Sequence, residues 1–189
     1  MNFLEQRIAE EGIVKPGNVL KVDSFLNHQM DIGLMEEIGR EFHRRFADKP
    51  VTKVLTIEAS GIAIATMVGY VLGCPLVFAK KSKSRNISNN VYSVEVESFT
   101  HGNINTVVLS KEYLGSSDRV LIVDDFLATG AALVGLKALA EQAGATVVGA
   151  GIAIEKVFQG GGEALRRQGL RIESLARIAA MSDDSLSFC

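Results

Sequence analysis

Three shortages in the sequence each exclude a class of protein: cysteine is rare, neither charge is in clear excess, and no long apolar run is free of charges. The two cysteines, Cys74 and Cys189, lie far apart without metal-ligand spacing, so we expect no disulfide framework and a reducing compartment. The formal net charge is −2 at pH 7, which favours neither nucleic acid nor an anionic membrane as a partner.

The best candidate for a membrane span is interrupted by charged side chains at Lys137, Glu141 and Glu155, so no uncharged run is long enough to cross a bilayer. The opening segment, M-N-F-L-E-Q-R-I-A-E-E-G, places acids within an apolar pattern and lacks the hydrophobic centre of a signal peptide. We therefore expect a cytoplasmic protein that has neither a membrane nor a nucleic-acid partner.

What the sequence does contain is a regular alternation of apolar strands and helices. Its 189 residues, 47% of them hydrophobic, suit one domain with a single sizeable core. Hydrophobic periodicity predicts helices at 3–11, 31–46, 61–73 and 130–144, and strands at 19–23, 53–57, 75–79, 119–123 and 145–154. Continuous apolar strands between helices indicate an α/β fold with a parallel sheet covered on both faces. An alternating pattern also predicts a two-stranded ribbon from 92–99 and 103–109.

The stretch V-L-I-V-D-D-F-L-A-T-G-A-A (120–132) places two acids at the end of a buried strand, where parallel sheets bind ligands. A single aspartate there commonly caps the next helix. Two together, Asp124 and Asp125, repel each other, so a site that keeps both usually offers them cations or hydroxyl donors. Small residues then open a helix, whose unpaired N–H groups and dipole favour a phosphate. These features together predict a site for a pentose 5-phosphate.

This stretch resembles the phosphoribosyl pyrophosphate (PRPP) signature of type I phosphoribosyltransferases, in the purine/pyrimidine phosphoribosyltransferase family. Two further segments, L-K-V-D-S-F-L-N-H-Q-M-D (20–31) and I-A-I-E-K-V-F-Q-G-G (152–161), resemble in particular the bacterial enzymes that act on xanthine. The resemblance implies purine salvage: PRPP and xanthine give xanthosine 5′-monophosphate (XMP) and pyrophosphate, with Mg²⁺ carried mainly by PRPP.

The resemblance also implies an architecture. The chain would form one domain, 1–189, on a parallel sheet. A small hood would come from about 1–50 and about 155–189, and a flexible lid loop would cover the site. A homodimer is expected, because the lid and ribbon of such enzymes often reach a neighbouring subunit.

The acid pair and the small residues after it receive roles from the same resemblance. Asp124 and Asp125 would be the catalytic residues, which hold the ribose hydroxyls directly or through metal-bound water and favour a developing cation. The 5-phosphate would be held by Ala128, Thr129, Gly130, Ala131 and Ala132.

Two further segments are expected to bind the pyrophosphate part of PRPP. The loop E-A-S-G-I (58–62) could be a simple turn containing glycine, but in the family it binds pyrophosphate through Ala59, Ser60 and Gly61, often with an unusual peptide geometry. The basic segment K-K-S-K-S-R-N-I-S-N-N (80–90) could be only a solvated loop. As a lid it would cover the leaving group and exclude water. The pattern does not choose among its basic residues, Lys80, Lys81, Lys83 and Arg85, and we take Lys81 as the candidate for the contact to PRPP.

The base site would be formed by residues from both ends of the chain. Lys156 could simply be exposed, the default for lysine, but the resemblance makes it the donor to the purine O6, with Phe158 stacked on the ring. Leu20 and Asn27 match positions that line the xanthine site, and the Asn27 amide suits the 2-oxo group.

Three alternatives stand beside this interpretation. A guanine/hypoxanthine enzyme shares O6 recognition, whereas Lys156 argues against adenine, whose 6-amino group is itself a donor. A non-catalytic regulator on the same fold could sense PRPP. A phospho-acceptor receiver domain also uses paired acids, but near the start of its fold rather than at residue 124.

Overall fold

The computed structural model describes residues 1–82, 90–97 and 104–189. In chain order the elements are α1 (Phe3–Glu11), β1 (Ile13–Lys15), β2 (Val19–Lys21), the π-helix η1 (Asp23–Asn27), α2 (Ile32–Arg45), β3 (Lys53–Ile57), α3 (Gly61–Leu72), β4 (Leu76–Ser82), β5 (Val91–Glu97), β6 (Ile104–Ser110), β7 (Arg119–Leu127), α4 (Ala131–Gln142), β8 (Thr146–Lys156), the 3₁₀ helix η2 (Val157–Gln159), α5 (Gly161–Arg167), β9 (Ile172–Met181) and β10 (Leu186–Phe188).

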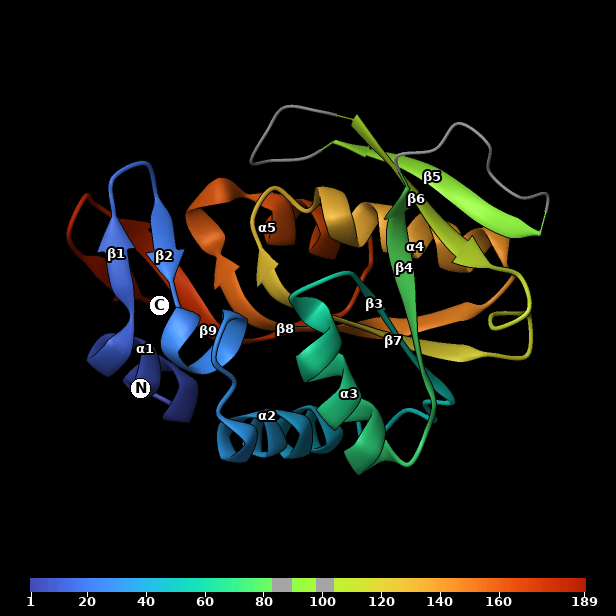
Figure 1. Ribbon diagram of the computed structural model, residues 1–189, viewed down its shortest axis with the longest axis horizontal. Helices are drawn as coiled ribbons and strands as arrows, with labels where there is room; N and C mark the ends of the chain where they lie inside the picture. The colour runs from blue at the N-terminus through green and yellow to red at the C-terminus, as the bar shows by residue number, and fades with distance from the viewer. Residues whose placement is uncertain (83–89, 98–103) are drawn as a thin grey trace.

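One large sheet organises the molecule. Its eight strands lie in the order β10-β9-β8-β7-β3-β4-β6-β5 (Figure 1). The five central strands, from β9 to β4, pair in parallel, and the strands at either end pair antiparallel. The predicted α/β fold with a parallel sheet is therefore confirmed, and β5 and β6 form the expected ribbon.

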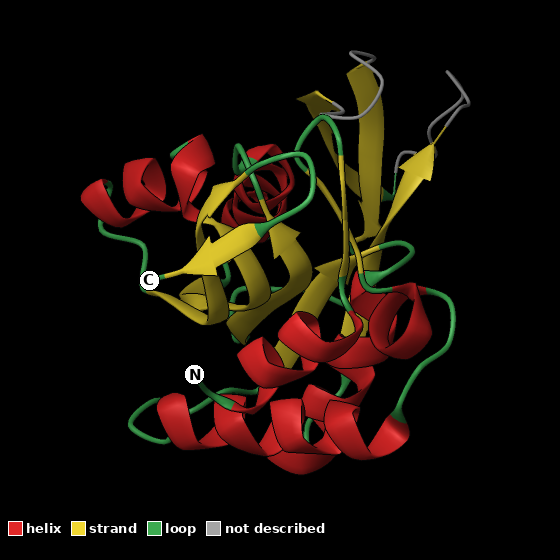
Figure 2. Ribbon diagram, turned by 90° about the vertical axis from the view of Figure 1, so that its left-hand side faces the viewer, coloured by secondary structure: helices red, strands yellow, loops and turns green. Residues whose placement is uncertain are grey.

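Helices cover both faces of this sheet (Figure 2), which explains why the central strands are apolar throughout. In β7, Leu121 and Val123 face a core that includes side chains of α1, α2 and α3, whereas Val120 and Ile122 face a second core with α4 and α5. Among the described helices, none is long and apolar enough to cross a membrane.

Strands β7 and β8 are longer than their apolar runs predict. They remain paired in parallel as far as Leu127 and Glu155, whereas β3, the other neighbour of β7, ends at Ile57. The acids are therefore part of β7 rather than residues beyond its end. Because β3 stops short, one side of this part of β7 is open to a ligand.

The two segments expected to form a hood differ in structure. Strands β1 and β2 make a separate two-stranded hairpin, but β9 and β10 at the other end of the chain extend the large sheet (Figure 1). The division into a core and a hood stays a prediction. Of the basic segment 80–90, residues 83–89, with Lys83 and Arg85, lie outside the described residues.

Candidate active site

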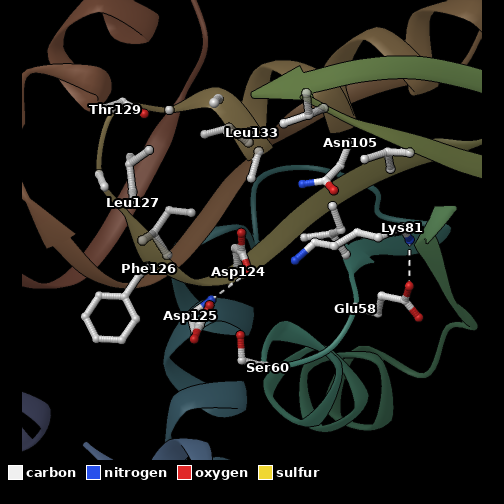
Figure 3. A pocket seen from close by; sticks show the side chains of 18 residues that line it. Glu58, Ser60, Lys81, Asn105, Asp124, Asp125, Phe126, Leu127, Thr129 and Leu133 are labelled. Carbon is white, nitrogen blue, oxygen red and sulfur yellow. Dashed lines mark hydrogen bonds between the residues drawn. The ribbon is translucent and has the colours of Figure 1, made fainter. Parts of the chain in front are cut away.

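The acid pair lies at a cavity of about 210 Å³ beyond the end of β3 (Figure 3). Asp124 and Asp125 both line it, yet these residues are only 6% and 8% exposed. The backbone N–H of Asp125 donates to Asp124 Oδ1 at 3.0 Å, which fixes that carboxylate against the strand. Two nearly buried carboxylates thus line a small cavity, where the hydroxyl groups of a ligand could pair with them.

Burial raises the pKa of Asp124 well above its usual range. The negative charge of Asp125 raises that pKa further, while the ammonium of Lys81 acts in the opposite direction. These effects together favour a proton on Asp124. A cationic or hydroxyl-bearing ligand would favour its release.

The loop that follows β7 forms the other wall of the cavity, and it presents the N-terminus of α4. Gly130 has a φ of 90°, a conformation that favours glycine, and no side chain of the described residues caps the helix. The first amides of α4 are therefore available to an anion. All five predicted phosphate-binding residues line the cavity: Ala128, Thr129, Gly130, Ala131 and Ala132.

The loop after β3 approaches the acids from the opposite side. Its Glu58–Ala59 peptide is cis, in agreement with the unusual geometry expected there. A Cβ on Gly61 would lie 2.8 Å from Asp124 Oδ1 and would collide with the hydroxyl of Thr56, so only glycine fits. Ser60 lines the cavity; Ala59 and Gly61 are in the same loop but not among its lining residues.

The two described lysines of the basic segment point in different directions. Lys81 lines the cavity, and in Figure 3 its side chain extends toward Asp124. Lys80, one residue earlier on β4, places its ammonium 5.7 Å from the ring centroid of Phe78 and borders a different cavity. The alternation of side chains along a strand thus separates the two lysines and favours Lys81 as the PRPP contact.

The residues predicted to bind the base lie outside this cavity. Lys156, the last residue of β8, donates to the backbone O of Asn18 at 2.8 Å, which brings the strand to the β1–β2 hairpin. Burial lowers the pKa of Lys156. Leu20 is buried on the hairpin, Phe158 is 38% exposed in η2, and Asn27 ends η1 with a buried Oδ1 that has no hydrogen-bond partner among the described residues.

Nine cavity-lining residues were not predicted from the sequence; six are aliphatic, and the other three are Glu58, Asn105 and Phe126. Phe126 follows the acid pair directly, and its ring centroid lies 5.5 Å from the ammonium of Lys156, so it links the cavity to the predicted base site. Its position next to the acids was a usable signal. Asn105 comes from β6, and nothing local in the sequence indicates that this strand folds over α4.

Comparison with known proteins agrees with this geometry. A family model described as the phosphoribosyl transferase domain matches residues 21–165. The chain belongs to the phosphoribosyltransferase family. A xanthine phosphoribosyltransferase of Finegoldia magna is 55% identical over 188 residues, which cover 100% of this chain and 99% of the relative. A second, from Lachnoclostridium phytofermentans, is 57% identical over 182 residues, which cover 96% of this chain and 94% of the relative.

Solved structures confirm the phosphoribosyltransferase fold. An adenine phosphoribosyltransferase of Giardia lamblia, in complex with 9-deazaadenine, has a TM-score of 0.78 at 23% identity and covers 94% of this chain and 98% of its own. One from Trypanosoma brucei, in complex with AMP, pyrophosphate and ribose-5-phosphate, has a TM-score of 0.77 at 18% identity. The match covers 93% of this chain and 79% of the Trypanosoma brucei chain. At these identities the likeness concerns the fold and not the choice of base.

Proposed function

We propose that this phosphoribosyltransferase transfers the 5-phosphoribosyl group of PRPP to xanthine, giving XMP and pyrophosphate in purine salvage. The observation that carries the reaction is the pairing of two nearly buried acids with the open N-terminus of α4 around one cavity. The choice of xanthine rests on the full-length relatives at 55% and 57% identity.

The proposed chemistry follows from where negative charge and amide donors lie. The amides of the loop 128–132 hold the 5-phosphate, and the acids hold the ribose hydroxyls. When pyrophosphate leaves, the ribose becomes cationic at C1, and the carboxylates of Asp124 and Asp125 then interact with it more strongly than in the ground state. The base nitrogen attacks C1 from the side opposite the pyrophosphate.

Mg²⁺ fits this site as an ion that is carried by PRPP. The described residues contain no group of three or more His, Cys, Asp or Glu side chains arranged to hold a metal. The carboxylates of Asp124 and Asp125 offer the hard oxygen ligands that Mg²⁺ prefers, and the remaining ligands would come from PRPP and water. When bound, the ion would neutralise negative charge on the leaving pyrophosphate.

The base would bind between Phe126 and the hairpin. Lys156 already lies beside the Phe126 ring and holds the hairpin through Asn18. Its ammonium can donate to the purine O6, and the Nδ2 group of Asn27 can donate to the 2-oxo group. A guanine/hypoxanthine enzyme is the second candidate, because O6 is common to these purines.

The test offers PRPP and Mg²⁺ with xanthine, guanine, hypoxanthine and adenine in separate reactions and follows nucleotide formation by ultraviolet absorbance. The highest catalytic efficiency is expected with xanthine. Faster reaction with guanine or hypoxanthine would support the second candidate, and PRPP binding without turnover of any base would favour the PRPP-sensing regulator. Homodimeric assembly and a cytoplasmic location are also part of this proposal; light scattering of the purified protein tests the first.

A further inference from the structure

The loop after β3 and the strand that leads into the basic segment are joined by a single side chain. The backbone N–H of Glu58 donates to the carbonyl of Ala79 at 3.0 Å, which is the usual parallel contact between β3 and β4. Two residues further along β4, the N–H of Lys81 has passed the end of β3. The Glu58 carboxylate accepts from it, with Oε1 and N 2.6 Å apart (Figure 3).

This contact replaces a backbone hydrogen bond by a stronger one. In a parallel pair, the carbonyl of Glu58 would be the next acceptor for Lys81, but the chain turns away there. A carboxylate makes a charge-assisted hydrogen bond, which is shorter and stronger than one between neutral groups. On its other edge, the same part of β4 pairs with β6, with Lys81 opposite Val107. Strand β4 is thus held on both of its edges at Lys81.

The fixed backbone determines the direction in which the Lys81 side chain points. Side chains alternate along β4: Val77 and Ala79 face the core under α4, and Lys81 follows them on the same face, into the cavity. Its charge acts on Asp124 and so reaches the place where pyrophosphate would leave. A one-residue slip of β4 would point Lys80 there instead.

We propose that Glu58 is a positioning residue. Its carboxylate fixes the backbone of Lys81 so that the ammonium faces the pyrophosphate subsite, which lies between the loop after β3 and the loop 128–132. This inference rests on the proposed transfer from PRPP. Glu58 itself does not need to touch the substrate. Its effect is to hold the Lys81 ammonium close to the negative charge that develops on the leaving group.

Two conservative substitutions distinguish the effect of the length of the Glu58 side chain from that of its charge. Glu58→Gln keeps a carbonyl acceptor at the same reach without the charge, whereas Glu58→Asp keeps the charge but is one methylene too short. Loss of a hydrogen bond to a charged group corresponds to about a tenfold to hundredfold change. The turnover rate with PRPP should fall by about that much in Glu58→Asp and Glu58→Ala, and by less in Glu58→Gln, which keeps a neutral and weaker acceptor at the same reach.

A double-mutant cycle tests whether Glu58 affects turnover through Lys81. Lys81→Met alone should lower turnover strongly, and adding Glu58→Asp should then cost little more, because the group that Glu58 positions is gone. Glu10→Ala, which removes an exposed carboxylate from α1, serves as the matched control and should leave turnover unchanged. Melting temperatures of all variants exclude general unfolding as the cause.

A second readout does not depend on the base. Magnesium pyrophosphate titrated into the protein by calorimetry should bind less tightly to Glu58→Asp and to Lys81→Met by similar factors. A wild type that binds pyrophosphate but turns over no base would contradict the proposed function and still support this inference. Unchanged pyrophosphate binding in Glu58→Asp, or equal losses of turnover from Glu58→Asp with and without Lys81, would overturn it.

Discussion

At the scale of single residues, the acid pair combines two opposing demands. Asp124 and Asp125 must be charged to stabilise a ribose cation, but they lie nearly buried and next to each other. Replacing either by asparagine keeps the shape and removes the charge. We expect Asp124→Asn and Asp125→Asn each to lower turnover on the order of a hundredfold, with a smaller effect on base binding. Steady-state kinetics with PRPP and xanthine measures both, and near-normal turnover in the two variants would reject the assignment.

The same burial predicts that Asp124 lowers the stability of the folded protein at neutral pH. Its pKa is raised by burial and by Asp125, so the folded state holds the proton more tightly than the unfolded chain. The contribution of Asp124 to stability is therefore greatest below the ordinary aspartate pKa and is lost as pH rises through the raised one. Asparagine does not ionise, so Asp124→Asn should raise the melting temperature at neutral pH, by about 2–4 °C for each kcal/mol gained.

Thermal unfolding of wild type and Asp124→Asn between about pH 4 and about pH 8 checks this expectation. The difference in melting temperature should grow with pH. A difference that stays constant across the range would show that ionisation of the acid pair does not affect stability.

At the scale of elements, the phosphate loop depends on the glycines of α5. Gly161 packs directly against the backbone of Ala128 and Thr129, where an added Cβ would collide with both residues. Gly161→Ala should therefore displace the loop and raise the Michaelis constant for PRPP, with a cost of about 1–3 kcal/mol as in other overpacked sites. The Michaelis constant for the base should change little.

Gly33→Ala is the matched control for Gly161→Ala. Gly33 is also in a helix, α2, but a Cβ there would meet only Asp31 Oδ1, at an ordinary 3.4 Å. Alanine should be tolerated or stabilise the helix by up to about 1 kcal/mol. If both variants leave PRPP kinetics unchanged, α5 does not support the phosphate loop.

Much of the fold could be predicted from the sequence, because the central elements carry local signals. The helix predicted at 61–73 is found at Gly61–Leu72, and Gly73 adopts the left-handed conformation that ends it. Strand β9 was missed because Glu173 and Arg177 interrupt its apolar residues. Glu173 forms an ion pair with Arg45 of α2, and Arg177 forms one with Glu155 of β8; no local pattern reveals these contacts.

In the candidate site, too, some parts carry local sequence signals and others depend on the folded sheet. The acid pair and the phosphate loop are contiguous in the chain, so their juxtaposition was predictable. The contact from Glu58 to Lys81 and the approach of Asn105 depend on how β3, β4 and β6 are paired, and that pairing exists only in the folded sheet.

At the scale of the whole molecule, the base site would join the two ends of the chain, and this gives a prediction about specificity. Lys156→Met removes the donor to an O6 that xanthine, hypoxanthine and guanine share, so all three should react more slowly. Asn27→Leu removes a contact that hypoxanthine cannot make, so the reaction of xanthine should slow while that of hypoxanthine should not. A site built to hydrogen-bond a group can reject an analogue that lacks it by roughly 10⁴.

The ratio of catalytic efficiencies for xanthine and hypoxanthine, measured in wild type and both variants, checks this pattern. It should fall in Asn27→Leu and stay closer to the wild-type value in Lys156→Met. An unchanged ratio in Asn27→Leu would mean that Asn27 does not set the specificity.

The central claim is that this chain converts PRPP and xanthine into XMP and pyrophosphate at its acid pair. The most direct measurement quantifies all four compounds over time by chromatography, for wild type and for the double variant Asp124→Asn/Asp125→Asn. We expect equal amounts of XMP and pyrophosphate from wild type, and a rate lower by at least a hundredfold, on the order of magnitude of one lost electrostatic contact, from the variant. Consumption of PRPP without XMP, or a variant as fast as wild type, would contradict the account.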